Sequence, residues 1–189
     1  MSVESITPTS ALKQYYDKLT LTLHWVTALI VIFLFASAQI WDQLEHGTFW
    51  RKTLQSLHIS FGITLAAIII IRLVWRATAG KKLPAASSSL LMHRIAKLTH
   101  WALYILLIAQ ITLGFLFRWA QGEPFMFFGL FTVPDIFSVD PLLRRTFGML
   151  HFYTAWTIII LAGLHACAAL FHHYVLRDNT LRRMIPPAK

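Results

Sequence analysis

The chain has 189 residues, of which 57% are hydrophobic and only 13% are charged, and its formal net charge is +9. Its mean hydropathy of +0.59 and its long apolar runs exclude an ordinary soluble fold, because a soluble domain of this size would not bury so much apolar surface. The single cysteine excludes a disulfide framework.

Four segments are apolar and long enough to cross a bilayer, and they are residues 20–42, 55–76, 98–118 and 148–174. They predict an all-α integral membrane protein in which four transmembrane helices form a bundle. We expect one domain, covering residues 1–189.

The charges are unevenly distributed between these segments. Basic residues gather before the first span, between the second and third spans, and after the fourth. The connections at 43–54 and 119–147 hold as many acids as bases. The positive-inside rule therefore predicts that both termini are cytoplasmic. The same rule explains the net positive charge by the orientation of the protein in the membrane, so nucleic-acid binding is not needed to explain it.

The first two predicted spans each begin with a histidine. His24 lies beside Trp25, a residue type common at the membrane surface. His58 opens the second span, and Arg72 follows 14 residues later, which on a helix is about 40° away in azimuth and roughly 21 Å further along the axis. Arg72 is therefore predicted to face the bundle at a second depth. The alternative is an arginine that extends to the lipid headgroups.

A polar connection over residues 77–93, in which His93 is solvated, is predicted to separate two helical hairpins. The third span repeats the histidine–tryptophan pair with His100, and Gly114 follows 14 residues later. Residues 119–147 are too rich in proline for a span and too apolar for a free loop, so they predict a cap on the outer face.

The fourth span carries His151, His165 and His172, with 14 and then 7 residues between them. His151 and His165 share one helical face at two depths. The four spans together predict two layers: an inner layer of His24, Arg72, His100 and His165, and an outer layer of Ala38, His58, Gly114 and His151.

Ionisable residues within a membrane span indicate a functional site. Two imidazoles from facing helices are typical axial ligands of haem iron, whereas zinc usually takes four ligands and a proton relay usually needs acids, which no span contains. For the outer site, only His58 and His151 are available. For the inner site, spacing favours His165 but leaves its partner open between His24 and His100.

Several short motifs occur in an order that resembles the bacterial cytochrome b561 family over residues 19–184. They are Leu23-His24-Trp25, Leu57-His58-Ile59-Ser60-Phe61-Gly62, Gly122-Glu123-Pro124, Leu164-His165 and Asp178-Asn179-Thr180-Leu181. The resemblance implies two haem b groups. His24 and His165 would hold the inner haem and His58 and His151 the outer one, with His100 close to the inner haem without binding its iron.

Further residues are expected around these groups. Arg72 is predicted to bind a propionate of the inner haem, and Arg144, Arg145 or Arg118 a propionate of the outer one, since the planar guanidinium suits a carboxylate. Each arginine has an alternative role as an interfacial anchor. Gly62 and Gly114 would let a flat macrocycle approach the backbone. His172 is predicted to donate to a quinone carbonyl or a propionate.

The resemblance also implies electron exchange with the membrane quinone pool, with ubiquinone as substrate, in a multi-pass protein of the bacterial inner membrane. Some family members oxidise superoxide at the outer face, although the balanced charge of the outer connections provides no attractive field for an anion here. A second hypothesis is an anchor subunit that relays electrons for a partner dehydrogenase or reductase. A third is a transporter or scaffold without a cofactor.

Overall fold

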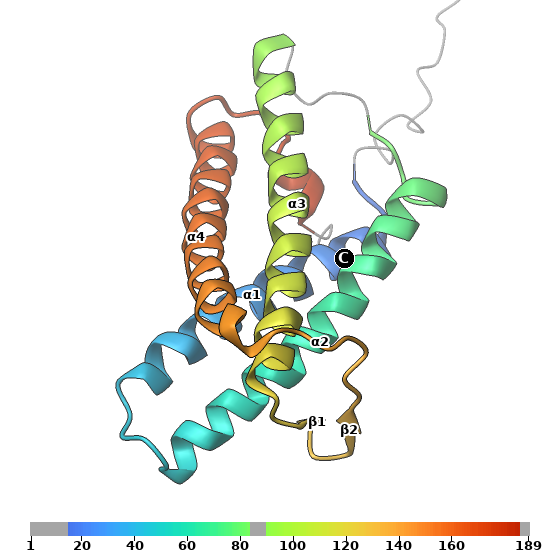
Figure 1. Cartoon of the computed structure of the whole chain (residues 1–189). Helices are drawn as coiled ribbons and strands as arrows, with labels where there is room; N and C mark the ends of the chain where they lie inside the picture. Colours follow the sequence, from blue (N-terminus) through green and yellow to red (C-terminus); the bar gives the residue numbers. More distant parts are fainter. Residues whose placement is uncertain (1–14, 84–89, 186–189) are drawn as a thin grey trace, which may run out of the picture.

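The computed structural model describes residues 15–83 and 90–185. Its four long helices are α1 (Lys18–Asp42), α2 (Phe49–Thr78), α3 (Leu90–Gln121) and α4 (Arg144–Tyr174), as Figure 1 shows. Each is long and apolar enough to cross a membrane. Large apolar side chains such as Leu29 and Ile70 point outward and are more than 60% exposed, as lipid-facing residues are. The predicted four-helix membrane fold is confirmed.

The helices extend beyond most of the predicted span boundaries. The 30 residues of α2 correspond to about 45 Å, which matches a bilayer with its headgroup regions and not the hydrocarbon core alone. Hydropathy locates the core of a span but gives no signal where a polar turn continues the helix. The prediction of a connection over 77–93 was therefore too long, and His93 lies exposed in the first turns of α3. Residues 84–89 of that connection lie outside the described residues.

The bundle consists of two helical hairpins. The backbone of α1 packs along α2 and that of α3 along α4, whereas α1 and α4 approach each other closely at few positions. The connection between α1 and α2 is short, which favours antiparallel neighbours. A small apolar core joins the hairpins and draws on all four helices. It consists of Ile30, Leu65, Ile69, Leu107 and Ile158.

A small β-hairpin follows α3 and lies near α2 (Figure 1). Its antiparallel strands are β1 (Phe125–Phe127) and β2 (Phe131–Val133). The fully buried Ser60 of α2 anchors it, because the Ser60 hydroxyl accepts a hydrogen bond of 2.9 Å from the backbone N–H of Phe128. The sequence predicted a cap in this region but no strands, since runs of proline, glycine and phenylalanine show no period of two.

Asp17 caps the start of α1 and connects it to the end of α2. Its carboxylate accepts hydrogen bonds from the backbone N–H and the hydroxyl of Thr20, at 2.8 and 2.7 Å. It also accepts one from the indole of Trp75 at 3.1 Å and one from the backbone N–H of Lys81 at 3.1 Å. One side chain thus serves as an N-cap and as a link within the first hairpin.

We expect the Asp17→Asn variant to be less stable than wild type at neutral pH, because it lacks the contribution of the ionised Asp17 carboxylate to the free energy of unfolding. Burial raises the pKa of Asp17, but the hydrogen bonds from Thr20, Lys81 and Trp75 outweigh it and lower the pKa to about 2. The ionised carboxylate therefore stabilises the fold above its unfolded pKa of about 4, and this contribution is lost as the pH falls towards 2.

The measurement is the thermal midpoint of wild type and variant in detergent at pH 7 and at pH 3. The difference between the two midpoints should be largest at pH 7 and clearly smaller, though not zero, at pH 3, where the folded carboxylate is still ionised. Asp17→Ala should cost about 1 kcal/mol or more at pH 7. An equal difference at both pH values would contradict the assigned role. Asp42→Asn, at the exposed last residue of α1, is the matched control.

Candidate functional site

The outer pair of histidines connects the two hairpins. His58 projects from α2 and His151 from α4, and their ring centroids lie 6.3 Å apart with the ring planes at 67°. A metal–imidazole bond is about 2 Å long and the ring centre lies about 1 Å beyond the nitrogen, so two imidazoles on opposite sides of one metal ion have centroids about 6 Å apart. The spacing of this pair fits that arrangement.

Backbone carbonyls hold both rings of the outer pair. Nδ1 of His58 lies 3.0 Å from the carbonyl oxygen of Leu34, and Nδ1 of His151 lies 3.1 Å from that of Gln110. A carbonyl only accepts, so each Nδ1 carries the ring proton and donates it. This leaves each Nε2 with the lone pair that binds a metal, and it is the pattern of support usual for metal-binding histidines.

Ser37 and Gln110 are contacts that sequence reasoning missed. The Ser37 hydroxyl is buried, lies 3.2 Å from Nδ1 of His58 and donates to the Leu34 carbonyl. The side-chain amide nitrogen of Gln110 lies 3.0 Å from Nε2 of His151, so a metal at Nε2 would have to displace this amide. A polar side chain in the middle of an apolar span is the signal that would have identified both residues.

Gly114 supports His151 sterically. A Cβ atom at this position of α3 would lie 3.2 Å from Cε1 of the His151 ring, which is closer than ordinary contact. A Cβ atom at Gly62, by contrast, would meet no heavy atom within 4 Å. Gly114 therefore lets the imidazole lie against the α3 backbone, whereas the position next to Gly62 is open.

Three histidines and an arginine form the inner cluster. The ring centroid of His165 lies 6.5 Å from that of His24 and 5.2 Å from that of His100. The first of these spacings matches the outer pair and the second is shorter. Each of these rings is held near the others by a different helix, so the predicted inner layer is brought together as a cluster.

Arg72 belongs to the same cluster. Its Nη2 lies 2.9 Å from Nδ1 of His24, and its guanidinium carbon lies 5.2 Å from the ring centre of Tyr104, in a cation–π contact. The prediction that Arg72 faces the bundle at the inner depth agrees with this position. Tyr104 was not singled out in the sequence.

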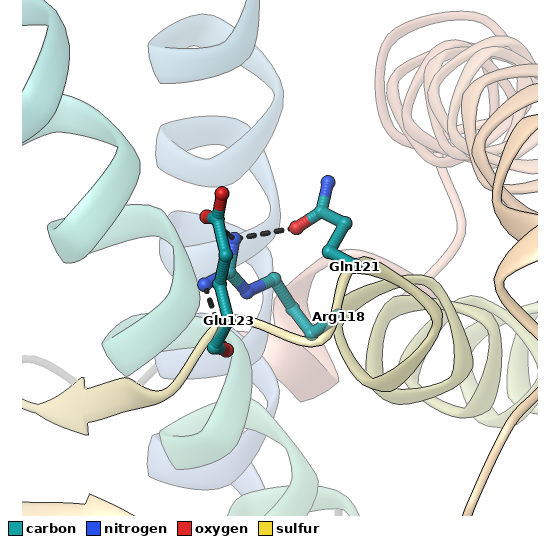
Figure 2. Close-up of polar contacts among 3 residues, drawn as sticks. All are labelled: Arg118, Gln121 and Glu123. Carbon is teal, nitrogen blue, oxygen red and sulfur yellow. Dashed lines mark hydrogen bonds and ion pairs between the residues drawn. The ribbon is translucent and has the colours of Figure 1, made fainter.

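The arginines considered for the outer haem lie at the end of α3 and the start of α4. Arg118 donates to the side-chain oxygen of Gln121 at 2.5 Å, and its guanidinium lies 3.7 Å from the Glu123 carboxylate (Figure 2). Arg144 and Arg145 are exposed at the start of α4, where they line a concavity of about 560 Å³ with Phe117. Arg118 is thus used in ordering the turn after α3.

His172 lies near the end of α4 and contacts a carboxylate. Its Nδ1 is 2.5 Å from Oδ2 of Asp178, whose other oxygen accepts from the backbone N–H of Thr180. Asp178 belongs to the segment that folds back after α4. The contact with Asp178 fixes the orientation of the His172 ring, which has no contact with the rings of the inner cluster among the described residues.

The arrangement suits a cofactor held by pairs of ligands. Within residues 15–83 and 90–185, no three histidine, cysteine, aspartate or glutamate side chains are placed to hold one metal ion. Zinc would need such a group. Haem iron needs only two axial ligands from the protein, because the macrocycle supplies the other four.

Comparison with known proteins gives the same result. A family model described as prokaryotic cytochrome b561 matches residues 15–187. The chain is 34% identical over 170 residues to cytochrome b561 homolog 2 of Escherichia coli (strain K12), covering 90% of each chain. It is 29% identical over 171 residues to the probable superoxide oxidase CybB of Yersinia pestis, covering 90% of this chain and 96% of that protein.

A third relative, cytochrome b562 of Cereibacter sphaeroides, is 25% identical over 178 residues, which are 91% of this chain and 96% of that protein. The match to the family model spans all four helices and every histidine of the two layers. The chain therefore belongs to the prokaryotic cytochrome b561 family of membrane proteins, which carry electrons across the membrane with haem b.

Proposed function

We propose that this protein carries two haem b groups and transfers electrons between a partner at the outer face and the membrane quinone pool. The outer haem is bound by His58 and His151 and the inner haem by His24 and His165. The observation that carries the proposal is that these two pairs have nearly the same ring spacing, 6.3 and 6.5 Å. In both pairs one ligand comes from each helical hairpin.

The haem supplies a one-electron centre, and the histidines decide how it is used. His58 with His151 and His24 with His165 would each hold one haem, and a haem held by two imidazoles would have no position open to oxygen, which favours electron transfer. The carbonyls of Leu34 and Gln110 fix the tautomer and orientation of the outer ligands. Because these acceptors are backbone atoms of α1 and α3, all four helices take part in holding the outer site.

Haem binding at the inner site would require the contact between Arg72 and His24 to be broken. Arg72 is a donor only, so beside His24 it pairs with an Nδ1 that carries no proton. If Nε2 of His24 held the haem, its Nδ1 would carry the proton and could no longer accept from a guanidinium. We assign Arg72 to a propionate of the inner haem, a carboxylate that suits its planar fork better than an imidazole does.

His151 and His165 place the two haems at different depths on α4, roughly 21 Å apart along the helix axis. Electrons thus pass from one membrane face to the other within one bundle, in the bacterial inner membrane. We assign the quinone site to His172, whose Nδ1–H is held by the Asp178 carboxylate and whose Nε2 could accept a hydrogen bond from the hydroxyl of the reduced quinone. The relative named a probable superoxide oxidase suggests superoxide as the outer electron donor.

The test is a reduced-minus-oxidised visible spectrum of the purified protein, with the haem quantified as its pyridine complex. We expect about two haems per chain and the low-spin spectrum that two imidazoles produce. Stopped-flow reduction by superoxide, followed by oxidation with a ubiquinone analogue, would establish the direction of electron flow. One haem per chain would remove one of the two sites, and none would overturn the proposal.

A further inference from the structure

A polar pocket of about 350 Å³ lies directly after the last turn of α4. It is lined by His173, Tyr174, Arg177, Asp178 and Arg182. None of these side chains belongs to the two histidine layers, and of the five only Asp178 enters the proposed function, through its contact with His172. Its lining is mainly polar and carries two guanidinium groups, which points to a ligand of negative charge.

A sharp reversal of the backbone forms this pocket. The backbone N–H groups of Val175 and Leu176 both donate to the carbonyl of Phe171, which ends the helix. Arg177 then adopts a φ of 54°, a left-handed conformation that is uncommon for a residue other than glycine. The N–H of Asp178 returns to the carbonyl of His172. This reversal keeps Arg177 beside His173 and Tyr174, at the end of α4.

The one carboxylate of the pocket is already bound by other groups. Asp178 accepts from Thr180 and contacts His172, and burial raises its pKa less than these hydrogen bonds lower it. The carboxylate is therefore ionised but is held by partners other than the arginines. Neither Arg177 nor Arg182 has an ion-pair partner among the described residues.

A histidine adds a further polar atom without a partner. Nδ1 of His173 is buried and has no hydrogen-bond partner within the described part of the chain. Buried polar atoms are normally satisfied, so such an atom in the wall of a polar pocket indicates a missing hydrogen-bonding group. Together, His173 and the two arginines offer a set of donors that suits a phosphate.

The pocket lies at the level of the membrane surface. The segment after α4 folds back against the start of α1, where the Trp25 indole donates to the carbonyl of Met184 at 2.8 Å and the backbone N–H of Tyr16 donates to that of Arg183 at 3.3 Å. Trp25 and Tyr174 are both exposed, as aromatic residues of the interfacial belt are. The anionic groups concentrated at this level are the phosphates of lipid headgroups.

We propose that Arg177 and Arg182 bind the phosphate of an anionic phospholipid headgroup in this pocket. Basic pockets at the end of transmembrane helices are suited to such headgroups, since the cationic side chains meet the lipid phosphate without leaving the interface. Binding there attaches the segment after α4, and with it Asp178 beside His172, to the membrane surface. This proposal does not depend on the haem content of the protein.

The test is native mass spectrometry of the full-length protein, released from micelles that contain phosphatidylglycerol or phosphatidylcholine. We expect wild type to retain one phosphatidylglycerol in preference to phosphatidylcholine. The double variant Arg177→Gln/Arg182→Gln should bind it about 30-fold more weakly, because each arginine near an anionic membrane surface contributes about fivefold. Arg94→Gln is the matched control, as it removes one exposed charge of α3 that lies outside the pocket.

Two further measurements decide the remaining outcomes. The single variant Arg182→Gln should lose about fivefold in lipid binding, and the thermal midpoint of each variant shows whether the fold is intact. A folded double variant that retains the lipid as wild type does would overturn the proposal. So would equal loss in Arg94→Gln, which would indicate general charge attraction. Inorganic phosphate could instead raise the thermal midpoint of wild type while phosphatidylglycerol is not selectively retained. That result would assign the pocket to a soluble phosphate and overturn the lipid assignment.

Discussion

Replacing His151 with leucine should reduce the haem content from two per chain to one. The ring centroids of His151 and His58 lie 6.3 Å apart, and among residues 15–83 and 90–185 no other histidine ring is in contact with this pair. Loss of one axial ligand therefore leaves no substitute within the described residues. Removing a residue that only supports a metal ligand typically costs about 10–100-fold in affinity, and removing the ligand itself should cost more. Pyridine-complex quantitation of the purified variant is the measurement.

His58→Leu should give the same result, and the double variant should lose no more haem than either single variant, because the two residues serve one centre. His46→Ala is the matched control, since His46 lies exposed in the connection between α1 and α2. Additive losses in the double variant would show that His58 and His151 belong to different sites. Two haems in His151→Leu would exclude His151 as a ligand.

The two layers could be predicted because a helix has a fixed geometry. A separation of 14 residues gives nearly the same azimuth and a known rise, so His151 and His165 had to face one side of α4 at two depths wherever the helix lay. Membrane spans are also the strongest structural signal in a sequence. The positions of His58 and Arg72 on α2 followed from the same argument.

The contacts around these layers could not be predicted in the same way. That Gln110 would contact both ring nitrogens of His151 depends on how α3 meets α4, which no periodicity within one helix encodes. The same holds for Ser37 beside His58. Arg72 was expected beside a haem propionate, but its contact with His24 depends on the packing of α1 against α2.

The outer connection shows a different limit. Gly122-Glu123-Pro124 was noted as a motif, yet its local structure depends on Arg118, one helical turn before it, as Figure 2 shows. Phe128 and Gly129 both have positive φ values at the tip of the β-hairpin, and only Gly129 is a residue type that predicts this. The strands are three residues long, too short for an alternating pattern to be recognised.

The partner of His165 is the question that spacing in the sequence left open, and geometry now favours His24. The 6.5 Å between the rings of His24 and His165 suits two ligands on opposite sides of one iron, whereas the 5.2 Å between His100 and His165 is too short for that arrangement. His24→Ala should therefore lose the inner haem and keep the outer one. His100→Ala should keep both haems, with a change only in the spectrum or reduction potential of the inner one, since the His100 ring lies against that of His165.

Haem quantitation and a redox titration of both variants distinguish the alternatives. His93→Ala is the control, because His93 lies at an exposed position on the same helix as His100. Loss of the inner haem in His100→Ala and its retention in His24→Ala would transfer the ligand from α1 to α3 and would leave His24 as the partner of Arg72 alone.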